Sequence, residues 1–359
     1  WKESLRKVQG MAAMFVDDDW VGLMDFLDEQ GGDGVRMPKR YIRDIDNPIN
    51  RYTDDGFVHR YRFSKEIVVQ VLVPLIAGEK LTRRGLPVPP IHRMCILLRF
   101  MATGSFQIVC ADLEHLHQST VCRIINATAK EIALHLPRYV HFPRNERGML
   151  ENKAAFQRMA GFEGVIGCID CTHIAIKNPN RNYGERFRNR KGWMSLNVQV
   201  VTGPNYEIQD IVIRWPGSAH DSRIFDASSL KLRYDRGELQ GILLGDGGYA
   251  QSSYLYTPVR DPQTRSEERY NHAHIRTRVV VERLFGIWKR RFSCLSRRLQ
   301  NKLGNAQTII AACAVLHNIG RMDNFANFQD DDMPPQVDNY VNPIEGDRRG
   351  LAIRRAFIE

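Results

Sequence analysis

At Gly164 the spacing of apolar residues changes from one typical of helices to one typical of strands. Three β-branched runs follow, separated by turn-forming residues: VIGCIDCTHIAI, LNVQVVTG and EIQDIVIRWPG. The turn Gly203-Pro204-Asn205 makes the second and third runs an antiparallel hairpin. The apolar run GILLGD predicts another, buried strand. The centre of the chain is therefore expected to be an α/β domain built on a sheet.

The segment before this point has the pattern of a helical domain. Over residues 61–143 apolar side chains recur at helical spacing. Within this segment, SFQIVCADLEHLHQSTVCRIINATAKEI predicts a helix-turn-helix, with a turn at 117–119 and a second helix N-capped by Ser119. We expect Arg123 and Lys130 on its outer face. Both DNA-groove docking and a purely structural helix pair fit the pattern.

The length of 359 residues also favours more than one domain. Long helices are expected at about 266–292 and 305–321, with a last helix near 350–357. The predicted organisation is an N-terminal arm at 1–60, a helical helix-turn-helix-like domain at 61–150, an α/β domain at 151–322 and a C-terminal extension at 323–359.

Charge is distributed unevenly along the chain. The net charge is +10, residues 177–191 carry six Lys or Arg against one acid, and residues 276–298 carry eight against one. Residues 17–33 reverse this balance, with seven acids and no base. Basic runs interleaved with aromatic residues indicate a surface that follows nucleic-acid phosphates, although a solvated surface explains either run alone. The sequence contains no stretch of about 18 apolar residues, so it predicts no membrane-spanning helix.

The cysteine pattern argues against disulfides and zinc. Seven cysteines are spread through apolar segments, which favours a reducing compartment. Cys168 and Cys171 form a lone CxxC without a second pair to complete a zinc site.

Three acids interrupt apolar neighbourhoods. Asp170 lies within the first strand, where a buried carboxylate needs a counter-charge or a metal. Asp246 ends GILLGD beside a Gly pair, and Glu282 follows three valines on the long helix. Converging carboxylates suit phosphodiester chemistry with two divalent ions, and hard oxygen ligands favour Mg²⁺ or Mn²⁺.

Four ordered motifs carry a family resemblance. GCIDCTHIAIKNP, WPGSAHDSRIF, LLGDGGYAQSSYLYTPV and VVVERLFGIWKRRF resemble the catalytic core of the PIF/Harbinger transposases and of their domesticated relatives in animals. The similarity covers about residues 61–320. It implies a ribonuclease H-like fold, with a mixed five-stranded sheet flanked by helices, and a metal-dependent endonuclease with two aspartates and a glutamate as catalytic triad.

The resemblance places this triad at Asp170, Asp246 and Glu282, which would also bind metal. Asp221 matches an acid of the family pattern too, and competes with Asp246 for the second position. Topology favours Asp246, because the second ligand in this fold follows the fourth strand. Asp221 would then bind metal secondarily or order its loop by capping.

Basic residues around the triad are candidates for DNA contact. Arg278, Glu282 and Lys289 share about one helix face and should point into one cleft. This spacing resembles the Tyr, Arg, Glu and Lys signature of bacterial insertion sequences, with Ile275 in place of the tyrosine. A surface salt bridge is the alternative for Arg278 and Lys289. The predicted DNA-binding residues are Arg123, Arg188, Arg190, Lys191, Arg278, Lys289, Arg290 and Arg291.

Three histidines lie near these motifs. His173 and His220 each neighbour a predicted ligand, and we expect local hydrogen bonds from them rather than general-base catalysis, because a metal-bound water needs no protein base. His317 is expected to be a core histidine.

The resemblance implies a nuclear transposase, present also in the cytoplasm, that cuts terminal inverted repeats and joins them to target DNA. It also implies a separately encoded Myb-like partner, and we expect a homodimer or larger assembly. A domesticated DNA- or partner-binding protein without transposition is the alternative. A non-catalytic helix-turn-helix DNA binder with structural acids is a third reading.

Overall fold

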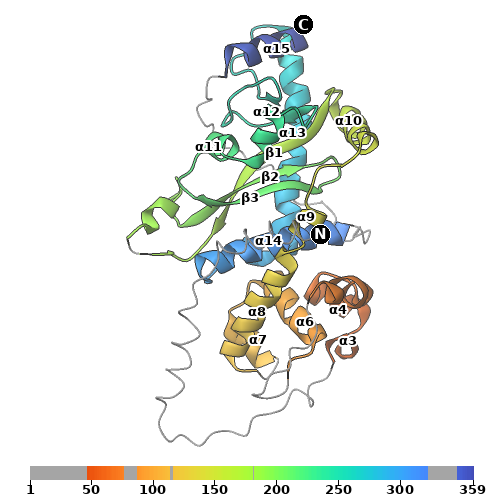
Figure 1. Cartoon of the computed structure of the whole chain (residues 1–359), viewed down its shortest axis with the longest axis vertical. Coiled ribbons are helices and arrows are strands. Elements are labelled where there is room, and N and C mark those ends of the chain that lie inside the picture. The colour runs from red at the N-terminus through yellow and green to blue at the C-terminus, as the bar shows by residue number, and fades with distance from the viewer. Residues whose placement is uncertain (1–46, 77–86, 114–115, 181, 322–345) are drawn as a thin grey trace, which may run out of the picture.

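The computed structural model describes residues 47–76, 87–113, 116–180, 182–321 and 346–359, and these form a sheet flanked by helices above a helical region (Figure 1). The acidic run at 17–33 and most of the predicted C-terminal extension lie outside these residues. Within the described ranges, no helix is long and apolar enough to cross a membrane.

The helical region begins earlier than the sequence suggests. Its helices are α3 (Pro48–Arg51), α4 (Asp54–Tyr61), α5 (Lys65–Ile67), α6 (Pro90–Thr103), α7 (Gln107–Leu113), α8 (Gln118–Ala133) and α9 (Leu136–Tyr139), with short turns η3 (Val68–Leu72) and η4 (Val73–Leu75) after α5. Thr53 caps α4 by accepting a hydrogen bond from Gly56 N, and Phe57 is fully buried. Helices thus form within the range predicted as an arm, while the domain boundary itself stays a prediction.

The α7–α8 pair has the expected short connection, but its N-cap differs from the prediction. His117, not Ser119, caps α8, because His117 has extended backbone angles and its Nδ1 lies 3.3 Å from the Ser119 amide nitrogen. Arg123 and Lys130 are exposed on α8, as expected. Groove docking by this helix stays a prediction.

The five-stranded mixed sheet confirms the predicted fold class. Its strands are β1 (Val165–Ala175), β2 (Ser195–Thr202), β3 (Ile208–Pro216), β4 (Ile242–Leu244) and β5 (Leu255–Tyr256), in the order β3-β2-β1-β4-β5. The first three strands are antiparallel neighbours, whereas β4 is parallel to both β1 and β5. Gly203 N donates to Glu207 O in the predicted hairpin turn, at 2.9 Å.

The remaining helices cover the sheet and connect it to the helical region. They are α10 (Glu146–Ala160), α11 (Asp221–Asp226), α12 (Ser229–Asp235), α13 (Arg265–Arg291), α14 (Leu303–Arg321) and α15 (Arg348–Ile358), with turns η5 (Gly184–Phe187) and η6 (Ser293–Leu295). Thr264 and Glu267 form a capping box that starts α13. Helices α13, α14 and α15 lie within two residues of the expected bounds.

One hydrophobic core joins the two regions. Leu97 of α6, Ile125 of α8, Leu316 of α14, Trp288 of α13 and Val198 of β2 are fully buried in the same cluster. Figure 1 shows α14 crossing between the helical region and the sheet. Burial of this helix on both sides explains why its central residues 309–316 are all apolar.

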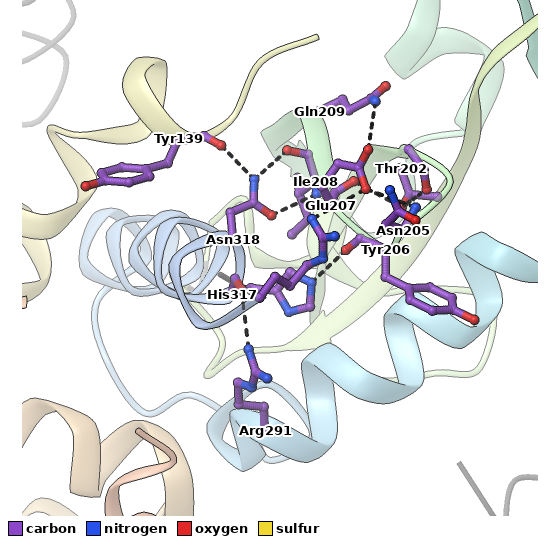
Figure 2. Close-up of polar contacts among 12 residues, drawn as sticks. Tyr139, Thr202, Asn205, Tyr206, Glu207, Ile208, Gln209, Arg291, His317 and Asn318 are labelled. Carbon is purple, nitrogen blue, oxygen red and sulfur yellow. Dashed lines mark hydrogen bonds and ion pairs between the residues drawn. The ribbon is translucent and has the colours of Figure 1, made fainter. Parts of the chain in front are cut away.

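Polar contacts fix α14 against the β2–β3 hairpin (Figure 2). Asn318 Nδ2 donates to the carbonyl oxygens of Tyr139, at 2.7 Å, and Ile208, at 2.8 Å, while its Oδ1 accepts from Ile208 N at 2.9 Å. His317 Nε2 lies 2.8 Å from Tyr206 O. The side chains of His317 and Asn318 are buried, so these contacts give their polar groups partners inside the protein.

Asn318→Ala is expected to lower the free energy of unfolding by about 3 kcal/mol, because the buried amide and carbonyl groups of Ile208 and the partly buried carbonyl group of Tyr139 lose their partner. Urea denaturation followed by circular dichroism measures the change. Asn182→Ala, on an exposed loop, is the control and should leave the midpoint unchanged. Equal midpoints for the two variants would contradict a stabilising role for the Asn318 contacts.

Candidate metal centre

Three carboxylates meet where β4 ends beside the middle of β1. Asp170 lies on β1, Asp246 follows β4 by two residues, and Asp221 is the first residue of α11. Each offers an oxygen atom, and the three atoms lie within 4.8 Å of one another. In the parallel register of β1 and β4, Cys168 pairs with Leu244, so Asp170 and Asp246 each follow this pair by two residues and lie side by side.

Short-range hydrogen bonds orient each carboxylate. Asp170 Oδ1 accepts from the Cys171 amide nitrogen at 2.7 Å, and Asp246 Oδ1 accepts from Gly248 N at 3.0 Å. A Cβ atom at Gly248 would approach Asp246 Oδ1 to 3.1 Å, so the Gly pair keeps space beside this acid. The oxygen atoms are therefore preorganised toward a common point.

Asp221 is held by a buried amide from the neighbouring strand. Asn197 Nδ2 donates to Asp221 Oδ1 at 2.8 Å and to Ala219 O at 2.9 Å. His220, rather than Asp221, occupies the N-cap position of α11, without a side-chain cap hydrogen bond. Asp221 is therefore not the N-cap residue of α11, and its role as a metal ligand stays a prediction. Its rank relative to Asp246 in the triad stays a prediction.

Glu282 is linked to Asp170 by hydrogen bonds from Arg278 to both acids. Arg278 Nη1 donates to Asp170 Oδ2 at 2.8 Å, and Arg278 Nη2 donates to Glu282 Oε1 at 2.6 Å. One guanidinium thus bridges β1 and α13, with the side chains of Arg278 and Asp170 each 11% exposed. Glu282 is not one of the three acids whose oxygen atoms lie within 4.8 Å of one another. Its catalytic role stays a prediction.

Lys289 faces the same strand, as its helical spacing suggests. Its Nζ donates to Thr172 Oγ1 at 2.6 Å and to His173 O at 3.3 Å. Burial lowers the pKa of Lys289 to about 8, and the positive charge of Lys191 acts in the same direction. The amine therefore still carries most of its charge at neutral pH.

The basic run before β2 borders the centre. Arg190 Nη2 lies 2.8 Å from His220 Nδ1, beside Asp221. Arg188 is exposed and pairs with Glu185 at 2.7 Å. Burial is the main cause that lowers the pKa of His173, and the positive charges of Lys289, Lys191 and Arg190 act in the same direction.

Two predicted DNA contacts lie elsewhere. Arg291 is only 3% exposed, and its Nη1 donates to His317 O at 3.3 Å (Figure 2), so a phosphate contact there is a wrong prediction. Its guanidinium packs against Gly320, where a Cβ atom would approach Arg291 Nη1 to 2.5 Å. Arg123 lies on α8 in the helical region, away from the sheet (Figure 1). Arg290 is partly buried near the end of α13.

The histidines have hydrogen-bonding surroundings. His173 Nδ1 lies 3.0 Å from Ser195 Oγ, and burial is the main cause that lowers its pKa. His317 is fully buried, and burial lowers its pKa to about 3, as fits a neutral core histidine. These positions agree with local roles for both residues.

The cysteines form no metal site among the described residues. All seven are free thiols, and the described cluster of potential metal ligands contains aspartates alone. Cys168 Sγ donates to Thr277 O at 3.6 Å, whereas Cys171 Sγ lies 3.4 Å from Tyr249 Oη. The CxxC pair therefore packs the strand against its neighbours.

Sequence reasoning missed Asn197, although its position in LNVQVVTG offered a signal. An amide inside a buried β-branched run needs a partner for each polar group. Its alternation with the flanking apolar residues does not reveal that the partner is Asp221, which lies 24 residues later.

Comparison with known proteins identifies the family of this chain. The model of the DDE superfamily endonuclease family matches residues 169–318. The candidate nuclease HARBI1 of Bos taurus is 33% identical over 272 residues, which cover 74% of this chain and 78% of its own. The same protein of Mus musculus is 33% identical over 301 residues, with 82% and 84% covered. The Arabidopsis thaliana protein named ALP1-like is 25% identical over 259 residues, with 66% and 61% covered.

No solved structure matches the chain at a significant level. The ribonuclease H-like sheet and its acid cluster define the class as a DDE superfamily endonuclease. Within that class, the chain belongs to the PIF/Harbinger family. Endonucleases of this superfamily use divalent cations and, as nucleases, act on nucleic acid.

Proposed function

We propose that this chain is an active metal-dependent DNA endonuclease of the Harbinger type, which cuts terminal inverted repeats and transfers the strands to target DNA. The observation that carries the proposal is the set of Asp170, Asp221 and Asp246, whose oxygen atoms lie within 4.8 Å of one another. Carboxylates that converge in this way repel one another, and a cation shared between them relieves the repulsion, so their convergence favours cation binding.

The donor atoms fit Mg²⁺ or Mn²⁺. All three side chains offer hard oxygen ligands, and the described cluster contains no sulfur or imidazole donor that would favour zinc. Asp170, Asp221 and Asp246 would hold the cations, with Glu282 as a further ligand. When bound, divalent cations activate water and neutralise charge that develops on the scissile phosphate.

The chain's own groups bind and orient the DNA. Arg278 holds Asp170 and Glu282 in place through its two short hydrogen bonds. Arg190 and Lys191, exposed beside the acids, would contact backbone phosphates, and Lys289 would add its charge at neutral pH. Arg188 and Arg290 extend this surface in the proposal, and Arg123 would contact DNA separately through α8.

The localisation, assembly and partner of the protein are proposed from its family. We propose a nuclear protein, present also in the cytoplasm, that works as a homodimer or larger assembly with a separately encoded Myb-like partner. A domesticated DNA- or partner-binding protein is the second candidate. The Arg278 bridge favours it in one respect, since it supplies a positive charge to Asp170 and Glu282 without a metal.

Duplexes that cover the genomic DNA flanking the gene test the proposal. With Mn²⁺ we expect cleavage at inverted repeats, and EDTA should abolish it. Asp246→Asn should reduce cleavage by about a thousandfold, and Asp221→Asn by less, because topology favours Asp246 as the triad member. Calorimetry should show at least tenfold weaker Mn²⁺ binding for both variants.

Flanking DNA without inverted repeats, bound but not cut, would instead support the domesticated reading. Cleavage that persists in EDTA would exclude a role for divalent cations. Stronger loss from Asp221→Asn than from Asp246→Asn would reverse the order of the two acids.

A further inference from the structure

A cavity of about 550 Å³ lies beside the acid cluster, and the proposed catalytic residues do not line it. Its walls include Trp215, Pro216, Arg186, Arg223 and His220. These residues come from the end of β3, the start of α11 and the turn η5. A volume of this size is sufficient for a small-molecule ligand or one nucleotide.

The cavity and the acid cluster share a wall. His220 lines the cavity, and the next residue, Asp221, belongs to the three-acid group. Asn197 Nδ2 connects them physically, because it donates both to Asp221 Oδ1 and to the carbonyl oxygen of Ala219, another lining residue. A nucleic-acid strand bound across the acids would therefore pass the opening of the cavity within one or two nucleotides of them.

The chemistry of the walls suits a nucleotide. The indole of Trp215 and the ring of Pro216 offer apolar surface, while Arg186 and Arg223 offer exposed positive charge. Arg223 Cζ lies 5.6 Å from the centre of the Trp215 ring. The cavity lining includes no acidic side chain. Aromatic surface next to guanidinium groups is the combination that binds an unstacked base and its phosphate.

We propose that this cavity binds one unpaired nucleotide of the DNA strand next to the scissile phosphate. The base lies against Trp215 and Pro216, and Arg186 and Arg223 contact the adjoining phosphate. The inference rests on the proposed function, since it assumes a DNA strand at the acids. In this arrangement one base of the strand lies outside the duplex, in the cavity, at a fixed distance from the cleaved bond.

Photocrosslinking tests the position of the base directly. Single 5-iodouracil substitutions are placed along DNA with an unpaired segment at the cleavage site, and complexes are formed in EDTA so that no cutting occurs. We expect one position, within two nucleotides of the cleaved bond, to crosslink to Trp215, as identified by mass spectrometry of the peptide. Crosslinks to other residues only, at every position, would overturn the proposal.

Binding measurements supply the energetic test. In EDTA, Trp215→Ala should weaken binding of this DNA by about tenfold, the scale of one lost base-aromatic stack, whereas Trp215→Phe should retain most of the affinity. Arg223→Ala should weaken binding and reduce its salt dependence. Arg214→Ala is the matched control, because Arg214 also lies near the indole, with Cζ 6.0 Å from the ring centre, but does not line the cavity.

The outcomes separate this inference from the proposed function. If the wild type binds and cuts DNA while Trp215→Ala and Arg223→Ala bind as tightly as Arg214→Ala, the nucleotide cavity is refuted and the nuclease stands. If the wild type neither binds nor cuts DNA, both fail. Should Trp215→Ala not fold, Arg223→Ala and the crosslinking of the wild type still decide the question.

Discussion

Asp170→Asn is expected to reduce metal-dependent DNA cleavage by about a thousandfold or more while leaving DNA binding nearly intact. Asparagine has nearly the same size as aspartate but lacks the negative charge that would bind the cation and that pairs with Arg278. DNA affinity should persist because exposed basic residues outside the strand, such as Arg190 and Lys191, supply the phosphate contacts. Single-turnover cleavage in Mn²⁺ and fluorescence anisotropy in EDTA measure the two quantities separately.

Asp226→Asn is the matched control, since Asp226 is exposed at the end of α11 and outside the acid cluster. The Asp170 variant also loses an ion pair with Arg278, so its melting temperature must be recorded and the assay run well below it. Cleavage at the wild-type rate by a folded Asp170→Asn protein would remove this acid from the proposed triad.

Much of the sheet could be predicted because its strands differ locally from the helices before them. In VIGCIDCTHIAI apolar and polar residues do not alternate regularly, as they would in a strand with one exposed face. The carboxylate of Asp170 within this apolar run already indicated a functional position. The family fold predicted Asp246 beside Asp170, and the parallel register of β1 and β4 places both acids two residues beyond the paired Cys168 and Leu244. These predictions depended on residues close in sequence or on the family fold.

Contacts between distant residues were harder to predict. The helical spacing allows Arg278 to pair with Glu282, four residues later, but it does not reveal the second hydrogen bond to Asp170, 108 residues earlier. Arg291 belongs to a basic run, so the sequence indicated a surface residue, but the packing of α14 buries it. Burial of a charged group depends on which element covers it, and this is a tertiary property.

The cavity beside the acids shows the same limit. Trp215 and Arg223 stand within WPGSAHDSRIF, which the sequence identified as a family motif because of its aspartate. Arg186 comes from a separate basic run, and its carbonyl oxygen accepts from Ser218 N at 3.2 Å. Only this folding of one loop onto another reveals that aromatic and basic residues share a pocket.

The Arg278 bridge predicts a second large effect, on stability rather than on activity. Arg278→Met is expected to lower the free energy of unfolding in EDTA by about 3 kcal/mol, because Asp170 and Glu282 lose a shared positive charge in a poorly solvated site. Asp221 and Asp246 lie close to Asp170, so their negative charges add repulsion to the loss.

Mn²⁺ should reverse much of this loss. A cation among the carboxylates replaces the missing positive charge, so saturating Mn²⁺ should stabilise Arg278→Met by more than it stabilises the wild type. Urea denaturation in EDTA and in Mn²⁺ gives the four free energies, and Arg283→Met, at an exposed position of α13, controls for loss of helix charge. Equal Mn²⁺ stabilisation of both proteins would mean that Arg278 and the cation do not neutralise the same carboxylates, and that the arginine is only a structural link between β1 and α13.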